Sequence, residues 1–198
     1  MAKRLFDLLV AGSALLLLLP LFAALALAIK LDSPGPVFFR QERVGRHGRL
    51  FRIHKFRSMV ADAPRRGPEV TVGRDVRITR IGHRLRDHRL DELAQLIDVV
   101  RGDMSLVGPR PEVPRYVAHY PPALREQVLA VRPGITDPAS LEHLDEAALL
   151  AGATDPEREY IERILPKKLA HQATYAAHAT LWSDLGVILR TLRLLIAR

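Results

Sequence analysis

Two adjacent carboxylates follow a run of arginines near the middle of the chain. Asp91 and Glu92 come soon after Arg84, Arg86 and Arg89, at the predicted start of a helix. Carboxylates are common at helix starts because they offset the positive end of the helix dipole, so capping alone would explain the pair. A helix start crowded by arginines also attracts phosphate. An anionic nucleophile could act there on an anionic substrate, because the cations offset the repulsion.

Arg110 is the second candidate for chemistry. It stands between Pro109 and Pro111, which fix the local backbone and push Arg110 toward an extended conformation. A guanidinium presented from a stiff loop suits bidentate binding of phosphate. An arginine in an ordinary surface turn would give the same pattern, and the residues alone leave both interpretations open.

The remaining polar residues are less informative. Asp98 and Asp103 are either oxygen ligands or charges at a helix end, and we favour the second interpretation. Zinc-site spacing is absent, so four histidines are interpreted as surface or packing residues: His47, His54, His83 and His88. The sequence has no P-loop lysine motif, no Gly-x-Gly-x-x-Gly fingerprint and no Gly-x-Ser-x-Gly elbow. With no cysteine, any metal must use oxygen or imidazole ligands.

The elements that would position these residues can be placed coarsely. Residues 37–44 and 50–56 are predicted strands of a hairpin around Gly45–Gly48, and the second strand presents Lys55. Residues 61–78 are predicted to form a loop.

Helical spacing recurs in three later stretches. It predicts a helix over residues 90–101 that stops at Gly102, with a shorter helix before it. A further helix begins at Pro121 and ends near Arg132. At the C-terminus one face of a helix is apolar, formed by Trp182, Leu185, Ile188, Leu189, Leu192, Leu195 and Ile196. That helix either lies in a membrane interface or packs on the core.

Composition and charge are unevenly distributed along the chain. The 198 residues include 30 Lys or Arg and 22 Asp or Glu, and the mean hydropathy is +0.02, which suits one domain and excludes a polytopic membrane protein. Residues 8–29 form a 22-residue stretch without a charged side chain. As a helix it would be about 33 Å long. Residues 40–90 carry a net charge of +10, so the whole positive excess follows the apolar stretch.

Three interpretations of the apolar stretch compete: a spanning helix, a cleaved signal peptide, and a helix that enters the membrane and turns back. Lys3, Arg4 and the Ala26–Ala28 segment resemble a signal peptide, but the mature chain would open with an arginine-rich region that resists export. Basic residues on both flanks leave the orientation undetermined, or place both flanks in the cytoplasm. Pro20 favours a kink. The residues alone support the spanning and re-entrant interpretations equally.

Several segments, taken in order, resemble the bacterial sugar transferase family, the monotopic phosphoglycosyl transferases. The matching blocks are Lys3–Asp7, Ser33–Phe38, Gln41–Gly45, Lys55–Met59, Leu90–Leu93, Gly102–Pro111 and Arg132–Thr136. Each block alone is weak. The ordered set extends over most of the chain and is highly specific.

The resemblance implies an enzyme that transfers a sugar-1-phosphate from a UDP-sugar to a polyprenyl phosphate of the undecaprenyl type. Asp91 would be the nucleophile that attacks the β-phosphorus, releasing UMP and leaving a sugar-phosphoryl aspartate. By resemblance Mg²⁺ is the cofactor, Asp91 contacts it, and Glu92 supports the metal or proton traffic. The implied substrate-binding residues are Lys55, Arg57, Arg86, Arg110, Arg132, Pro133, Gly134 and Thr136.

The resemblance also implies a fold and a location. The expected fold class is α+β, a single domain over residues 1–198 with a re-entrant helix in residues 1–32. Residues 33–198 would form the catalytic part, with interfacial helices and a small hairpin around the active site. The expected location is the cytoplasmic face of the bacterial inner membrane, among membrane lipids. The oligomeric state is left open, with a homo-oligomer as one possibility. This chain would then catalyse the first membrane step of a glycoconjugate pathway, such as exopolysaccharide, O-antigen, capsule or glycoprotein glycan synthesis.

Two departures from the family pattern affect these expectations. Leu19-Pro20 stands where the family typically has Ser before Pro, which leaves the bend angle open. Asp137-Pro138-Ala139-Ser140 replaces a Gly-Trp continuation, which leaves the donor contacts of this region open.

Two rival functions follow from the same sequence. A membrane-anchored basic adaptor that binds acidic lipid or nucleic acid accounts for the net charge of +8 but not for the ordered acidic and Pro-Arg-Pro motifs. Few aromatic residues are interleaved with the basic ones, so no nucleic-acid partner is expected. The second rival, an enzyme that transfers the sugar alone, would release UDP instead of UMP.

Overall fold

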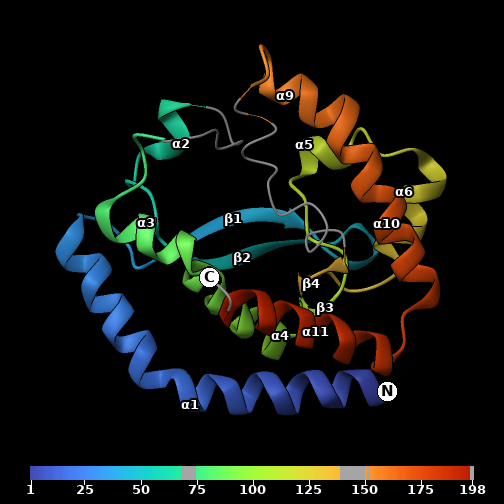
Figure 1. The fold of residues 1–198 in the computed structure, drawn as a ribbon, viewed down its shortest axis with the longest axis horizontal. Helices are drawn as coiled ribbons and strands as arrows, with labels where there is room; N and C mark the ends of the chain where they lie inside the picture. Colours follow the sequence, from blue (N-terminus) through green and yellow to red (C-terminus); the bar gives the residue numbers. More distant parts are fainter. Residues whose placement is uncertain (68–74, 139–149, 151, 197–198) are drawn as a thin grey trace.

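The N-terminal apolar stretch forms one long bent helix. The computed structural model describes residues 1–67, 75–138, 150 and 152–196, and its first element is α1 (Ala2–Asp32). Figure 1 shows α1 running along one side of the molecule and then changing direction. The helix contains Pro20, which removes a backbone hydrogen bond and is an ordinary cause of such a bend. By length and composition α1 could cross a membrane, and only 6% of its most apolar window is buried within the protein.

The predicted hairpin is confirmed. Strands β1 (Phe38–Val44) and β2 (Leu50–Phe56) are antiparallel, with Phe38 opposite Phe56 and Val44 opposite Leu50. The tight connection between them uses the left-handed conformation at His47 and Gly48. This hairpin fixes Lys55 next to the end of β2.

The helical region after the hairpin is more divided than the periodicity predicts. The predicted loop contains a short helix, α2 (Ala63–Arg66). The shorter helix that was predicted before residue 90 is α3 (Arg80–Asp87). The predicted helix over residues 90–101 is a 3₁₀ turn, η2 (Leu90–Gln95), which continues as α4 (Leu96–Arg101). The predicted stop at Gly102 is confirmed, because this glycine ends α4 in the left-handed conformation.

A second small sheet was not predicted. Strands β3 (Ser105–Val107) and β4 (Gly134–Thr136) pair in parallel. Two glycines let the segments meet: a Cβ at Gly134 would lie 2.0 Å from the backbone N of Gly108. Strands of three residues are too short to show an alternating pattern, so the sequence contains no periodic signal for them.

The remaining described elements are mostly helices. The described ones are α5 (Pro114–Val117), α6 (Pro122–Leu129), α9 (Pro156–Glu159), the π-helical turn η3 (Tyr160–Ile164), α10 (Leu165–His178) and α11 (Leu181–Ile196). Helix α6 ends before Arg132, earlier than predicted. In α11 Val187 is buried while Trp182, Leu189 and Leu192 are exposed, so this helix both packs on the core and presents an apolar outer surface.

One hydrophobic cluster joins the first part of α1 to both sheets. Its buried members are Ala11, Phe51, Ile53, Leu96, Val99, Met104, Leu106, Val107, Tyr175 and Val187. Figure 1 shows α1, α4 and α11 close together on one side of the molecule. The fold class is therefore mixed α+β, with a long apolar helix and two small sheets.

Candidate active site

Asp91 lies at a cavity lined largely by cationic and apolar residues. Its carboxyl is on η2 and only 7% of the residue is exposed. The cavity, which we call the Asp91 groove, has a volume of about 510 Å³ and is also lined by Lys55, Arg57 and Arg86. Four of the residues singled out in the sequence therefore share one cavity. Their elements are the end of β2, α3 and η2.

Glu92 is held by two cations. The Lys55 ammonium donates to Glu92 Oε1 at 2.8 Å, and the Arg110 guanidinium donates to the same oxygen at 2.5 Å. A second Arg110 nitrogen lies 3.4 Å from Oε2. Burial by itself would raise the pKa of Glu92, but Arg110 and Lys55 together hold this pKa well below its usual range. Glu92 is therefore a carboxylate that orients Lys55 and Arg110 beside Asp91.

Asp91 has a different environment from its neighbour. In the part of the chain that the structure describes, no hydrogen bond reaches the Asp91 carboxyl. Burial raises its pKa, and the negative charge of Glu92 adds to this rise, while Lys55, Arg86 and Arg110 oppose it. A buried carboxyl beside open space and three cations is typical of a catalytic group.

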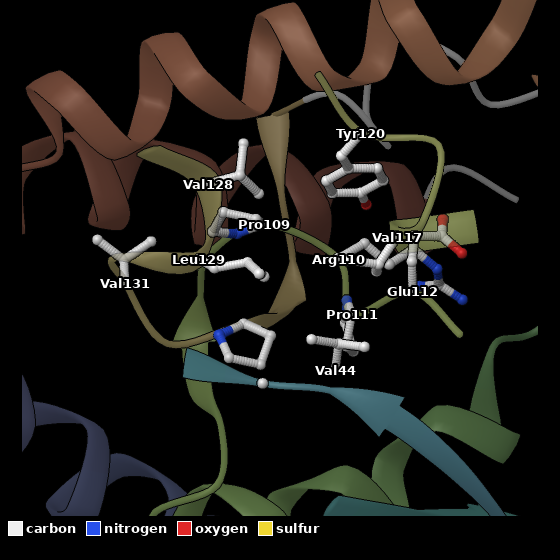
Figure 2. Close-up of a pocket in the computed structure, with 12 residues that line it drawn as sticks. Val44, Pro109, Arg110, Pro111, Glu112, Val117, Tyr120, Val128, Leu129 and Val131 are labelled. Atoms are coloured by element: carbon white, nitrogen blue, oxygen red, sulfur yellow. The ribbon is translucent and has the colours of Figure 1, made fainter. Parts of the chain in front are cut away.

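The Arg110 loop is tied to the second sheet. The Arg110 backbone N–H donates to Asp137 Oδ2 at 2.9 Å, and the N–H of Gly134 donates to the Pro109 carbonyl at 3.0 Å. Figure 2 shows Pro109, Arg110, Pro111 and Glu112 around a small cavity. Its volume is about 10 Å³, close to what one water needs.

Glu112 anchors the far end of this loop, and sequence reasoning missed it. Its Oε1 accepts a hydrogen bond of 2.5 Å from the Tyr160 hydroxyl and lies 3.4 Å from the Lys168 ammonium. Arg43 lies 3.7 Å from Oε2 and donates to the Pro111 carbonyl at 2.9 Å. We call Arg43, Glu112, Tyr160 and Lys168 the Glu112 cluster. Burial alone would raise the Glu112 pKa, but Lys168, Arg43 and the Tyr160 hydrogen bond lower it.

Arg57 and Arg86 line the groove but also have structural partners. Arg57 is 3% exposed and donates to the carbonyls of Ile29, Ser33 and Pro34, which closes the end of α1. Arg86 donates to the Ser58 hydroxyl at 3.2 Å. Burial lowers the pKa of Arg57. Arg57 thus connects the end of α1 to the groove wall.

Residues 132–136 lie outside the Asp91 groove. Arg132 donates to the Gly102 carbonyl at 2.9 Å, and Gly134 is buried in the contact between β3 and β4, directly after Pro133. The hydroxyls of Thr136 and Thr191 are 2.8 Å apart, which joins β4 to α11. These predicted substrate-binding residues therefore lie outside the groove, next to the Arg110 loop through the Gly134–Pro109 hydrogen bond, and their role stays a prediction.

Asp98 has a structural environment, but it is not the charge at a helix end that we favoured, because it is buried within α4. Asp98 Oδ2 accepts a hydrogen bond from the His54 backbone N–H at 2.8 Å, and Asp98 Oδ1 lies 2.5 Å from His54 Nδ1. This contact fixes β2 against α4, and the packing interpretation of His54 is confirmed. Asp103 lies 3.6 Å from Arg101 at the helix end. Within the described residues, no three His, Asp or Glu side chains come together as a ready-made metal site.

Comparison with known proteins identifies the family. The model of the bacterial sugar transferase family matches residues 1–198. The chain is 40% identical, over 96% of its length, to a UDP-N-acetylgalactosamine-undecaprenyl-phosphate N-acetylgalactosaminephosphotransferase of Aeromonas hydrophila. It is 39% identical, again over 96%, to a UDP-glucose:undecaprenyl-phosphate glucose-1-phosphate transferase of Caulobacter vibrioides. An exopolysaccharide production protein of Rhizobium leguminosarum bv. phaseoli is 51% identical over 54% of the chain.

The relatives differ in length from this chain. The chain spans 43% of the Aeromonas protein, 67% of the Caulobacter protein and 54% of the Rhizobium protein. The matched family model covers every element that lines the groove, from the hairpin through α3 to η2, and it also covers the Arg110 loop. The chain belongs to the bacterial sugar transferase family.

Proposed function

We propose that this chain transfers a sugar-1-phosphate from a UDP-sugar to undecaprenyl phosphate and releases UMP. The observation that carries the proposal is the Asp91 carboxyl, which lines the groove without a hydrogen bond from the described residues and has cations around it. The names of the Aeromonas and Caulobacter relatives support the two substrate classes. The name of the Rhizobium relative supports a role in exopolysaccharide production.

The reaction would proceed in two displacements at phosphorus. In the first, an Asp91 oxygen attacks the β-phosphorus of the UDP-sugar, and the bond from this phosphorus to the bridging oxygen breaks. UMP leaves with that oxygen, and the sugar phosphate stays on Asp91. In the second, an oxygen of undecaprenyl phosphate attacks the same phosphorus. The aspartyl bond breaks, and undecaprenyl-diphospho-sugar leaves.

The residues around Asp91 suit both steps. Lys55, Arg86 and Arg110 lower the cost of bringing an anionic substrate to a carboxylate, and each also opposes the rise in the Asp91 pKa. Glu92 keeps Lys55 and Arg110 in place. We propose that Arg110 binds a phosphate of the donor in bidentate fashion, with Lys55 and Arg86 as further contacts and Arg57 at the wall of the groove.

The donor set of the groove fits Mg²⁺. This ion is usually held by one or two carboxylates together with substrate phosphates, and Asp91 offers such an oxygen at the cavity surface, with Glu92 next to it in sequence. When bound, Mg²⁺ would offset charge during phosphoryl transfer. Lys55 and Arg110 already donate to the Glu92 carboxylate, so we assign Asp91 as the principal ligand of the ion and Glu92 as its support.

We further propose that α1 is re-entrant and that residues 33–198 form the cytoplasmic catalytic part of a single monotopic unit over residues 1–198. The bend in α1, its exposed leucines and the exposed Trp182 and Leu192 on α11 support a unit embedded in one leaflet. In this arrangement both ends of α1 lie at the cytoplasmic face of the inner membrane.

Cysteine labelling tests this topology. The chain has no cysteine, so Ala2→Cys and Leu31→Cys each introduce a unique thiol at opposite ends of α1. A membrane-impermeant reagent should label both from the cytoplasmic side. Labelling of the two positions from opposite sides would make α1 a spanning helix.

Product analysis tests the reaction. The purified chain in lipid nanodiscs would be given Mg²⁺, undecaprenyl phosphate and a panel of UDP-sugars. We expect UMP as the nucleotide product with at least one donor. Without the acceptor, we expect one UMP per protein at most and a matching gain in protein mass. Release of UDP would instead indicate transfer of the sugar alone. No turnover, together with salt-dependent nucleic-acid binding, would support the adaptor function.

A further inference from the structure

Asp7 is a buried carboxylate in the membrane helix, and the proposed reaction does not use it. It precedes the 22-residue uncharged stretch and is 2% exposed. A carboxylate in such a place is costly unless hydrogen bonds satisfy it. Both of its oxygens are used: Oδ2 accepts from the Ser105 hydroxyl at 2.8 Å, and Oδ1 accepts from the Leu106 backbone N–H at 3.2 Å.

Both partners of Asp7 belong to β3, which leads directly into the Arg110 loop. Beyond β3, the Gly108 N–H donates to the Thr136 carbonyl at 3.1 Å, and the Pro109 carbonyl accepts from Gly134 at 3.0 Å. The only residues between β3 and Arg110 are Gly108 and Pro109, and this proline restricts the backbone. A displacement of β3 would therefore move the Arg110 guanidinium relative to Glu92 and Asp91.

Lys3 makes a second connection from the same end of α1. Its ammonium donates to the Val107 carbonyl at 3.1 Å and pairs with the buried Asp184 of α11. The Tyr175 hydroxyl donates to Asp184 at 2.6 Å and lies 3.1 Å from the Val107 carbonyl. The N-terminal part of α1 thus contacts β3 at all three of its residues, while β4 holds β3 from another direction.

From these contacts we infer that the first two turns of α1 are a positioning element of the active site, with Asp7 as the positioning residue that acts on Arg110 through β3. The inference rests on the proposed function, since Arg110 is taken as a donor contact. The anchor then has a second role, because the helix that would hold the chain in the membrane also sets the distance between Arg110 and Asp91.

Substitutions at Asp7 separate positioning from anchoring. Asp7→Ala should lower the rate of UMP release about tenfold, because a displaced binding group weakens the reacting geometry. Asp7→Asn should restore most of the rate, since its amide can accept from the Leu106 N–H and donate to the Ser105 oxygen. Ser105→Ala removes one of the two hydrogen bonds and should cost about threefold. Ser13→Ala changes an exposed polar residue on the same helix and serves as the matched control.

A double-mutant cycle with Arg110 tests the route of the effect. If Asp7 acts through Arg110, Asp7→Ala should have little further effect in an Arg110→Ala background, measured as single-turnover UMP release. A full, additive loss in that background would overturn the inference, and so would Asp7→Asn no better than Asp7→Ala. Loss of Asp7→Ala from the membrane fraction would make the residue an anchor determinant and also overturn it. Absence of UMP release by the unmodified chain would instead defeat the proposed function itself.

Discussion

The Asp91 groove and the Glu112 cluster each bury a carboxyl group among cations, yet the pKa values of the two carboxyls shift in opposite directions. The Glu112 carboxylate accepts a hydrogen bond of 2.5 Å from the Tyr160 hydroxyl and lies near Lys168 and Arg43. These contacts lower its pKa. Asp91 receives no hydrogen bond from the described residues, and its pKa is raised. Among the described residues, Glu112 therefore has hydrogen-bond donors for its carboxylate, whereas Asp91 has none.

This difference separates a structural charge from a reactive one. A carboxylate whose oxygens are occupied by fixed donors cannot approach a substrate without first losing them. No hydrogen bond from the described residues reaches the Asp91 oxygens beside about 510 Å³ of open space, while the neighbouring Glu92 accepts the direct contacts of Lys55 and Arg110. The Asp91–Glu92 pair therefore divides the work: Glu92 holds the cations, and Asp91 faces the groove.

The most severe way to test the comparison is to neutralise each carboxyl in turn. Asp91→Asn should reduce UMP release by about a thousandfold or more, because the covalent intermediate cannot form. Glu112→Gln should keep activity of the wild-type order per folded molecule, because Arg110 retains its contacts with Glu92 and Asp137. Asp103→Asn, a partly exposed acid at the end of α4, is the matched control. Substantial turnover by Asp91→Asn would contradict the nucleophile assignment.

Arg110 is the next test, because it connects the two regions. Arg110→Lys keeps the charge but loses the two-nitrogen contact with Glu92, so we expect about a thirtyfold loss of kcat/KM for the UDP-sugar. Arg125→Lys on the outer surface of α6 provides the control for an exposed arginine. If the two variants lose kcat/KM equally, the positive charge of residue 110 is enough, and the two-nitrogen geometry of Arg110 has no specific role.

The parts of this site that the sequence predicts are those formed by neighbours in the chain. Asp91 and Glu92 are adjacent, Arg110 is fixed by its own flanking prolines, and the hairpin strands are separated by a short turn. Each of these features has a local cause. The contact of the hairpin with η2, which brings Lys55 to Glu92, was not predicted, although resemblance to the family pointed to both residues.

The features that the sequence did not predict depend on distant partners. Glu112 meets Tyr160 and Lys168 on elements that begin more than forty residues later, with no pattern to relate them. Arg57 was expected at a substrate, and its contacts with the end of α1 need the folded position of that helix. Asp7 is similar, because a lone acid beside an apolar stretch does not indicate which strand it will contact. The cysteine-free composition and net charge carry no information on any of these contacts.

Lys55 offers a milder test, based on pH. Lys55 lowers the pKa of Asp91, so Lys55→Met should let burial raise this pKa further. Asp91 must be ionised to attack, and activity is lost as the pH falls through its pKa. The acid limb of UMP release should therefore move to higher pH in the variant, measured with saturating donor. Lys167→Met, on the exposed side of α10, should leave the profile unchanged. An unchanged or lower limb in Lys55→Met would show that Lys55 does not govern the charge on Asp91.

The smallest effect on catalysis, but a clear one on stability, should come from the Glu112 cluster. Glu112→Gln breaks the ion pair between Glu112 and Lys168, which is 3% exposed, and should lower the free energy of unfolding by about 3 kcal/mol. Because the pKa of Glu112 is lowered in the folded state, its stabilisation is complete above the ordinary value of 4.5 and is lost as the pH falls through the folded pKa. The stability difference between wild type and Glu112→Gln should therefore shrink in acid.

The companion variant decides whether this loss of stability reflects the broken Glu112–Lys168 ion pair. Adding Lys168→Met to Glu112→Gln removes the buried cation that has lost its pairing with Glu112, so denaturant unfolding at neutral pH should show part of the stability restored. If the double variant is less stable than Glu112→Gln, Lys168 stabilises the fold by packing on the Tyr160 ring, whose centroid lies 5.2 Å from its ammonium, more than by pairing with Glu112. In that case the Tyr160 hydroxyl, which can still donate to the side chain at position 112 in both variants, would be the contact that distinguishes the Glu112 site from the Asp91 site.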